Sequence, residues 1–505
     1  MWWIALYLPQ WPLEALGPAA PHGVEEGGRL VCLGPAAVRA GIERGMSVTA
    51  ARARLPDIRV CPRQPERETQ ALRPLALAAL RFSPQLCMHP EGLLIEVQGS
   101  LRLFGGPLNL WRQLVGAVDS FKVCAHFAAA PFPEASWLLA RVRGPLRRGP
   151  ALGVAQSRQP PAVHPVLDTL PMTGVLQAWQ APAAAHDLLT GLGVATLGAL
   201  RALPRAGLQR RLGAALLARI DQAYGLAPDP RPFWAPPPAF DERLDLPERT
   251  QDAAVLAQAL AHLLQALEGW LCAHTQRAQV LALHFLHEVR RREALPDTVH
   301  TLRLAAPEHQ AGALQRLWDE RLRRHPLTAP VVALRLVLQA AVAPQTQDVQ
   351  QSWALGAPAS ATAREDPAEI RRALARLLDR LQSRLGAQAV HGLCAEDDHR
   401  PERATRWVDV AHQAPAPSRS PPAGPQPLWL LPEPEPLAER QGHPVHEGAL
   451  LVLRTRAERI EAGWFDGEPV CRDYYVAEGP DQRLRWVFRQ GRGDAQSWFL
   501  HGWFN

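Results

Sequence analysis

Carboxylates, the side chains that most often hold metal ions or move protons, are missing from the start of this chain. The run Met1–Gln10 contains no Asp or Glu, and its apolar stretch ends at Pro9, which predicts a short buried strand. Farther on, Glu91 and Glu96 share one predicted strand, but they are an odd number of positions apart and so lie on opposite faces. We therefore expect no catalytic carboxylate pair on this strand.

Motifs for other kinds of chemistry are absent from the sequence. It contains no Walker A loop, no H-E-x-x-H pair, no G-x-S-x-G elbow and no dinucleotide-binding fingerprint. His284, His287 and Glu288 follow one another along a predicted strand whose side chains alternate, which argues against a metal site there. The seven cysteines are scattered without a C-x-x-C pair. We expect no cofactor and no bound metal.

Composition indicates a soluble protein of several domains. Its 505 residues suffice for three or four, and a net charge of +6 is compatible with nucleic acid as a partner. No run approaches the ~18 uninterrupted apolar residues of a membrane span. The first apolar run lacks a basic leader and is too short for a signal peptide. We expect a cytoplasmic protein with no membrane partner.

The order of elements predicts an α+β protein. Short strands alternate with helices over residues 1–164, whereas residues 165–227 are helical with glycine turns. A proline-rich linker follows at 228–239. Residues 240–412 then give the order βαββαβ, which is typical of a four-stranded sheet backed by two helices.

A further helix with clear end signals closes the βαββαβ segment. Asp366, Pro367 and Glu369 supply an N-cap, a first-turn proline and a capping-box glutamate, and Gly386 ends the helix. Its apolar residues fall on one face: Ile370, Leu374, Leu377, Leu378, Leu381 and Leu385.

The end of the chain is dense in aromatic side chains. A second linker, rich in Pro, Ala and Ser, spans 413–427, and residues 428–505 form a compact module. We expect most of its rings to pack a core. The last four rings are better candidates for contact with a partner protein: Trp498, Phe499, Trp503 and Phe504.

A basic stretch lies within the helical segment, because Leu188 to Ile220 holds five arginines and no acid. A glycine hairpin at Gly191 and Gly193 precedes the arginines, and such a turn aims backbone N–H groups at phosphate. The arginines that would add charge for DNA are Arg201, Arg205, Arg210 and Arg211. A helical subdomain whose arginines are simply solvated explains the pattern equally well.

Four stretches, in the same order, resemble the Y-family (lesion-bypass) DNA polymerases. They are the strand Trp3–Leu8, the fingers-like pattern Gly41–Pro56, the stretch from Arg81 to Val97, and the glycine hairpin, placed like the thumb. The βαββαβ segment lies where that family has its little finger. The resemblance assigns palm and fingers to 1–164, thumb to 165–227 and little finger to 240–412.

The residues that would transfer a nucleotide are missing at the aligned positions. In that family, carboxylates hold the magnesium ions that activate the primer hydroxyl and bridge the triphosphate. The aspartates of the first strand align with Leu6 and Leu8, and the Asp-Glu pair of the other strand aligns with Glu91 and Gly92. Of these positions only Glu91 keeps a carboxylate, and leucine cannot coordinate magnesium.

Contacts to the incoming nucleotide are lost as well. The fingers tyrosine and arginine of the family align with Pro35 and Val38, and its lysine loop aligns with Ala128–Pro133, which has no lysine. A misalignment by one or two residues does not restore the metal site, because all of Met1–Gln10 lacks a carboxylate.

These departures bring the chain closer to the ImuB subfamily, the catalytically silent Y-family branch of bacterial mutagenesis cassettes. The similar segments span the chain: Leu6–Gln10, Leu103–Gly106, His399–Ala404, Asp473–Val476 and Trp498–Phe504. The resemblance implies an adaptor that binds primer–template DNA and docks on the sliding clamp. It also implies two protein partners, an error-prone replicative-type polymerase (ImuC) and a RecA-like protein (ImuA or its analogue).

A clamp-binding peptide of such proteins has a glutamine followed by two spaced apolar anchors in an exposed loop. Gln350, Trp353 and Leu355 fit this spacing, between a predicted strand and the capped helix. An ordinary loop with one tucked tryptophan would look much the same.

The sequence therefore predicts a non-catalytic, DNA-binding adaptor of translesion synthesis, associated with the nucleoid. One alternative is a low-activity Y-family polymerase with displaced metal ligands. Another is a protein-interaction module that no longer touches DNA. Primer extension separates the first alternative from the adaptor, and a gel shift on primer–template DNA separates the second.

Overall fold

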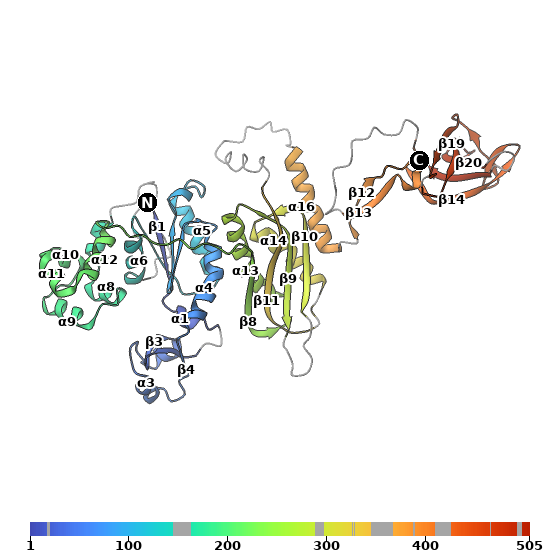
Figure 1. Ribbon diagram of the computed structural model, residues 1–505. Coiled ribbons are helices and arrows are strands. Elements are labelled where there is room, and N and C mark those ends of the chain that lie inside the picture. The colour runs from blue at the N-terminus through green and yellow to red at the C-terminus, as the bar shows by residue number, and fades with distance from the viewer. Residues whose placement is uncertain are drawn as a thin grey trace. The chain divides into compact units, whose positions relative to one another are not determined.

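The computed structural model is shown in Figure 1. It describes residues 1–17, 21–144, 163–287, 297–325, 327, 329–344, 367–386, 389–409, 426–464, 466–491 and 497–504. Contacts divide the chain into two compact units, Met1–Arg380 and Leu381–Asn505, and each is described by itself. Helices and sheets alternate through several modules, so the predicted α+β multidomain class is confirmed.

A four-stranded antiparallel sheet, in the order β5-β6-β1-β7, forms the centre of the first unit. Its strands are β1 (Trp3–Tyr7), β5 (Leu86–His89), β6 (Gly92–Glu96) and β7 (His126–Ala130). All five residues of β1 are buried, as its uncharged sequence predicts.

Helices cover both faces of this palm-like sheet. They are α4 (Pro65–Ala79), α5 (Pro107–Ser120) and α6 (Pro133–Val142), and a short turn of 3₁₀ helix, Gln98–Ser100, follows β6. In Figure 1, α6 lies on one side of the sheet, and α4 and α5 lie on the other. The sheet is therefore a middle layer with helices on both faces.

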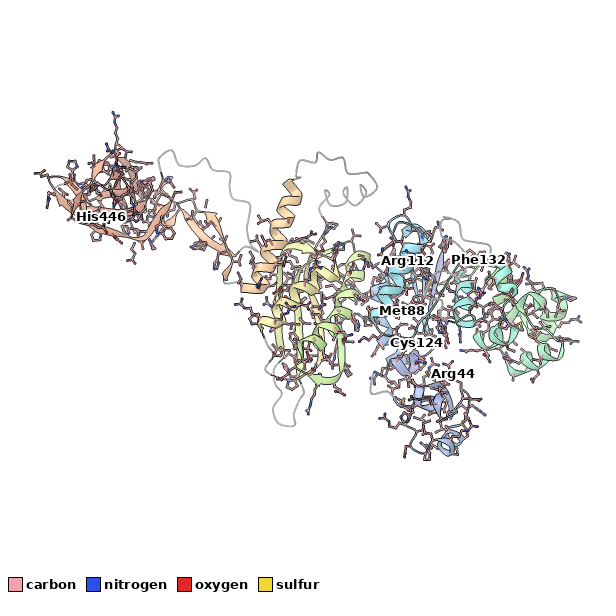
Figure 2. All side chains as sticks on the ribbon, turned by 180° about the vertical axis from the view of Figure 1, so that it is seen from behind. Arg44, Met88, Arg112, Cys124, Phe132 and His446 are labelled. Carbon is pink, nitrogen blue, oxygen red and sulfur yellow. The ribbon has the colours of Figure 1, made fainter. Side chains whose placement is uncertain are left out.

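A small lobe between β1 and α4 corresponds to the predicted fingers. Its three-stranded sheet has the order β3-β2-β4. Its elements are α1 (Trp11–Glu14), β2 (Gly23–Glu26), β3 (Arg29–Leu33), α2 (Pro35–Arg39), α3 (Val48–Arg54) and β4 (Val60–Pro62). Arg44, labelled in Figure 2, ties the lobe to the palm by donating to the carbonyl oxygen of Pro9 at 2.9 Å.

The thumb-like segment is entirely helical, as expected. Its helices are α7 (His164–Asp168), α8 (Met172–Ala178), α9 (Ala183–Gly191), α10 (Leu197–Arg201), α11 (Arg205–Leu212) and α12 (Ala214–Tyr224). The glycine hairpin joins α9 to α10, and Gly193 has a φ of +66°, which favours glycine. Thr196 caps α10 by accepting a hydrogen bond from the N–H of Ala199 at 3.2 Å.

The βαββαβ module is confirmed as a four-stranded sheet in the order β10-β9-β11-β8. Its elements are β8 (Asp241–Thr250), α13 (Ala253–Ala273), β9 (Arg277–His287), β10 (Thr298–Glu308), α14 (Ala311–Arg324) and β11 (Val331–Val342). In length and composition α13 could cross a membrane, but 61% of its apolar window is buried inside the protein. This burial identifies α13 as a core helix of the module.

The little-finger-like module packs tightly on the palm through α13 and α4. A Cβ added to Gly269 of α13 would lie 1.9 Å from the carbonyl oxygen of Leu77 in α4, so the two helix backbones touch at this point. Nearby, Arg73 forms an ion pair at 2.8 Å with Glu242, whose side chain is almost fully buried. Because Gly269 has no Cβ, α13 can approach α4 this closely.

The predicted linker 228–239 also lies against the palm. Arg231 forms an ion pair with Glu134 at 2.6 Å, and Phe233 stacks on Trp3 with ring centroids 6.3 Å apart. Trp234 donates its backbone N–H to the carbonyl oxygen of Leu86 at 2.7 Å. Proline content suggested a spacer, but these contacts fix the segment along the palm-like sheet.

Helix α16 (Pro367–Leu385) ends just before Gly386, as its sequence signals predict. The proposed N-cap Asp366 lies outside the described residues.

The second unit is built almost wholly of strands. A two-stranded ribbon consists of β12 (His391–Ala395) and β13 (Thr405–Asp409), with a 3₁₀ turn at Pro401–Arg403 between them. An eight-stranded sheet follows in the order β16-β15-β14-β21-β20-β19-β17, with β18 on β19. Its strands are β14 (Trp429–Arg440), β15 (His443–His446), β16 (Ala449–Leu450), β17 (Val452–Leu453), β18 (Glu458–Ala462), β19 (Val470–Glu478), β20 (Leu484–Gln490) and β21 (Ser497–Trp503).

A buried arginine fastens the ribbon's connecting turn to this sheet. Arg400 is 2% exposed and forms ion pairs with Asp398 and Asp466. Glu402 pairs with Arg472 of β19 at 2.9 Å. The sequence predicted a linker at 413–427 as the boundary of the C-terminal module. The contacts of Arg400 and Glu402 instead join residues 389–409 to the C-terminal sheet.

Candidate functional site

The two leucines at the aligned metal positions lie in the core of the palm-like domain. Leu6 and Leu8 are 0% and 1% exposed. Leu6 pairs across the sheet with Phe127, whose ring meets Trp111 of α5 at 5.8 Å, so this face of β1 points toward α5. No solvent or substrate reaches these side chains.

The opposite face of β1 carries the polar groups, and sequence reasoning missed it. His89, Gly92, Tyr7 and His126 form one row across β5, β6, β1 and β7, because each is paired with the next in the sheet register. Alternation of side chains puts them on the same face. Period-two spacing predicts that such a row exists, but the pairing register that assembles it comes from the fold.

Aromatic rings fill the space above this row. Trp137 of α6 lies 4.1 Å from the ring of His89 and 5.9 Å from that of Tyr7, centroid to centroid. His126 meets Tyr7 edge-on at 5.8 Å. Tyr7 and Trp137 are both nearly inaccessible, at 6% and 5% exposed. The row is thus packed in the manner of a core.

Gly92 has no room for a side chain. Its φ is +149°, and an added Cβ would lie 1.9 Å from the carbonyl oxygen of Leu6. The second carboxylate of the resemblance aligns here, so a glutamate or aspartate would collide with the neighbouring strand.

Glu91, the one carboxylate left at the aligned positions, is held by an arginine. Arg141 of α6 forms an ion pair with it at 2.8 Å and lies over the Tyr7 ring, 5.0 Å from its centroid. Glu91 also donates its backbone N–H to Nδ1 of His89 at 3.2 Å. Burial, helped by the charge of Arg141, lowers the pKa of His89 to about 4, so this ring is neutral at pH 7.

The site does not fit the pair of magnesium ions that the resemblance implies. Divalent magnesium needs several oxygen ligands. The row itself contains no carboxylate, and Glu91 beside it is already paired with Arg141. Within the described ranges, no group of three or more His, Cys, Asp and Glu side chains is placed to hold a metal ion.

The positions aligned with nucleotide-contacting residues offer no substitute. Val38 is 57% exposed on α2 of the fingers-like lobe, and Pro35 begins that helix. The segment Ala128–Pro133 runs from the end of β7 into α6 and is mostly buried. Neither segment presents a cation at the row.

The thumb-like arginines fall into two groups. Arg201 pairs with Asp168 at 3.3 Å and lies over the Tyr224 ring, and Arg205 pairs with Asp221. Both acids come from outside the acid-free window of the sequence. Hydrogen bonding to Arg205 lowers the pKa of Asp221, which keeps that pair charged.

The other two arginines predicted to bind DNA, Arg210 and Arg211, keep their charge available. Arg210 and Arg211 line a hollow of about 350 Å³ beside the glycine hairpin, and neither is ion-paired with an acid in the part of the chain that the structure describes. Arg210 donates only to the carbonyl oxygen of Ala206, at 3.3 Å. Gly191 and Gly193 face open space, so the hairpin backbone is accessible.

The clamp-motif residues Gln350, Trp353 and Leu355 lie outside the described residues. Their assignment stays a prediction from the sequence.

The terminal aromatic residues pack inside the second unit. Trp498 is 2% exposed, Phe499 stacks on Phe488 at 5.1 Å, and Arg485 lies over the Trp503 ring. Phe504 packs against a buried aromatic cluster. The expectation that chain-end rings project toward a partner is not met by Trp498, because its side chain is buried in a hydrophobic cluster of the sheet.

Other apolar side chains are on the surface of this unit instead. Leu393 and Trp407 face each other across the β12–β13 ribbon and are 60% and 70% exposed. Leu428 and Trp429, at the start of β14, are exposed to a similar degree. Nothing in the sequence marks these four, since exposed and buried tryptophans look alike there.

Comparison with known proteins gives one consistent result. No family model matches the chain. Two curated relatives, each called Protein ImuB, come from Caulobacter vibrioides strains NA1000 / CB15N and ATCC 19089 / CB 15. Each is 30% identical over 486 residues, covering 92% of this chain and 100% of the relative.

Solved structures of Y-family polymerases resemble the chain more distantly. A Dbh ternary complex is 16% identical with a TM-score of 0.37, and DinB from Sulfolobus solfataricus is 15% identical with the same TM-score. Each match covers 68% of this chain and 100% of the other. On the strength of its relatives over nearly the whole length, the chain belongs to the ImuB family.

Proposed function

We propose that this protein is a non-catalytic adaptor of translesion synthesis. It binds primer–template DNA and links the sliding clamp, an error-prone replicative-type polymerase and a RecA-like partner at the nucleoid. One observation carries the proposal: aromatic rings fill the space above the row His89–Gly92–Tyr7–His126, and the backbone of Leu6 leaves no room for a side chain at position 92. Such a site can support a scaffold but cannot coordinate magnesium.

Primer extension tests the absence of catalysis. The purified full chain, with magnesium and all four deoxynucleotides, should extend a labelled primer no faster than buffer does. Incorporation that disappears in Glu91→Ala would establish the alternative, a low-activity polymerase with displaced ligands. Glu91 makes an ion pair with Arg141, so Arg141→Gln is the control for a merely structural effect.

DNA binding is proposed to depend on Arg210 and Arg211, whose charges are not neutralised within the thumb-like segment. Phosphate contacts dominate such binding and make it salt-dependent, with a slope of about −0.9 per contact on duplex DNA. We expect the double variant Arg210→Gln/Arg211→Gln to weaken binding of primer–template DNA and to flatten the slope by about 2. The assay is fluorescence anisotropy over a salt series.

Arg205→Gln is the matched control, because Arg205 is already paired with Asp221. We expect it to change the slope far less than the double variant does. Equal effects would contradict the division of the arginines into two groups, and no binding of wild-type protein at low salt would favour a module that has lost contact with DNA.

Clamp docking is proposed at Gln350, Trp353 and Leu355. Alanine at all three should abolish co-elution with the sliding clamp while DNA binding is unchanged. Unchanged co-elution would place the clamp contact elsewhere in the chain.

The second unit is proposed to recruit the polymerase or the RecA-like partner. Because Arg400 ties the β12–β13 ribbon to the C-terminal sheet, a clean deletion begins after Gly386 rather than at residue 428. This deletion should keep DNA binding and lose at least one partner in a pull-down. Trp407→Ala tests whether the exposed ribbon makes the contact, and retention of both partners by the deletion would refute a recruiting unit.

A further inference from the structure

Helix α16 exposes three of its five leucines, and the other two, Leu378 and Leu381, are half-buried. Leu374, Leu377 and Leu385 are 53%, 49% and 48% exposed. Its buried side is polar, since Asp379 and Gln382 are 4% and 9% exposed. An amphipathic helix on a domain surface normally turns its apolar stripe inward, so this arrangement is reversed.

The reversal has a local cause in strand β10. The register of β10 against β9 shifts between Arg303 and Glu308, which marks an irregularity of the bulge type. The Asp379 carboxylate accepts the freed N–H groups of Ala305, at 2.6 Å, and Ala306, at 3.2 Å. Buried donors without a partner are costly, so this carboxylate decides which side of α16 faces the sheet.

Helical geometry then turns the leucines away. Asp379 follows Leu374 by five positions, which is about 140° around the helix. Leu374 and Leu377 therefore cannot face the sheet while Asp379 caps the irregularity in β10. The exposed stripe is a fixed consequence of the fold, and contiguous exposed apolar surface is typical of a protein interface.

The charge around the stripe is basic. Residues 373–385, whose side chains the structure describes, contain three arginines and one acid, the buried Asp379, a net charge of 3 − 1 = +2. Arg380 follows Leu377 by three positions and so lies next to it on the helix surface. Arg376 is mostly exposed, and its ion pair with Glu308 is long at 3.8 Å. The surface therefore complements a partner that is both apolar and acidic.

We propose that this face of α16 docks an acidic amphipathic helix from a partner protein. The leucines lie along one side of the helix, which matches a helix that presents its own apolar stripe and glutamates at the flank. A second copy of this chain would set arginine against arginine. The proposal uses α16 alone and does not rest on the adaptor function.

The test measures binding of a synthetic acidic helical peptide, with leucines along one face and glutamates on both flanks. The matched peptide has lysine in place of every glutamate. Labelled peptide is titrated with the full chain in fluorescence anisotropy. We expect the acidic peptide to bind, more weakly as salt rises, and the lysine peptide not to bind.

Variants of the full chain locate the contact. Leu374→Ser/Leu377→Ser should weaken binding by about tenfold or more, as loss of central apolar anchors does. Leu103→Ser is the matched control, because Leu103 is also exposed, at 70%, and belongs to the palm-like domain, far from α16 in the sequence. It should leave binding unchanged. Unchanged melting curves confirm that both variants remain folded.

Several results would overturn the proposal. They are equal binding of the two peptides, or no loss in Leu374→Ser/Leu377→Ser. A third such result is that anionic phosphatidylglycerol vesicles bind the wild type but not that variant, while the peptide fails to bind. This result would assign the face to a membrane. A wild-type dimer in sedimentation that the same variant dissolves would assign it to a second copy.

Discussion

Gly92 gives the sharpest test of whether this sheet could hold a catalytic carboxylate. Its φ of +149° lies in a region that favours glycine, and an added Cβ would lie 1.9 Å from the carbonyl oxygen of Leu6. We expect Gly92→Ala to destabilise the palm-like sheet, because β1 and β6 must separate or the backbone must change its conformation.

Two costs set the size of this effect. Holding a non-glycine residue in a sparsely populated backbone conformation costs about 1–3 kcal/mol. Inserting a methyl group into a filled core costs about 1–3 kcal/mol more. The sum, about 2–6 kcal/mol, is a large part of the roughly 5–15 kcal/mol that stabilises a folded protein.

Hydrogen exchange followed by mass spectrometry resolves the effect, because it reports β1 and β6 separately from the second unit. We expect faster exchange in peptides that cover both strands. Gly116→Ala is the matched control: Gly116 lies in α5, and an added Cβ there would meet nothing within 4 Å. It should gain up to about 1 kcal/mol from helix propensity. Wild-type exchange rates in Gly92→Ala would show that a side chain fits beside Leu6, and the argument against a metal site would lose its main support.

Three further predictions concern other parts of the fold. Gly269→Ala should destabilise the contact of α13 with α4 by about 1–3 kcal/mol and speed hydrogen exchange in both helices, whereas Gly312→Ala, which meets open space in α14, should not. Arg400→Gln should destabilise the second unit, because it leaves Asp398 without its cation and Asp466 with Arg403 alone, and a lowered melting temperature would show it. Burial lowers the pKa of His501 to about 4, so the unfolded state binds more protons between that pH and about 6.5, and thermal stability of the unit should fall as pH drops through this range. A His501→Gln variant with the same pH dependence would assign the effect to other groups.

The sequence predicted the modules of this fold better than the faces of its elements. The apolar run at β1, the βαββαβ order and the glycine ends of helices are local signals, and the structure has all of them. Which face of β1 meets α6 depends on pairing with β6 and β7. The aligned position Leu6 lies on the face toward α5, whereas Tyr7 lies on the face with Glu91 and Arg141.

Long-range contacts explain the other differences. The acid-free window around the thumb-like arginines looked uniformly basic, yet Asp168 and Asp221 return from outside it to neutralise Arg201 and Arg205. The apolar face of α16 was evident from spacing, but its direction was not. It depends on Asp379 meeting two backbone groups more than seventy residues away in the chain.

The packed row is the physical basis for proposing a scaffold rather than a polymerase. A working two-metal site holds several carboxylates close together in partly dry surroundings, which destabilises the fold until the metal binds. Here neutral rings fill that space, and the single carboxylate is balanced by Arg141. One substitution therefore cannot build a metal site here: Leu6→Asp would bury an unpaired carboxylate on the α5 face, and Gly92→Glu would collide with β1. Regaining a metal site would require emptying the row of Tyr7 and Trp137 as well, at the expense of the core that holds the unit together.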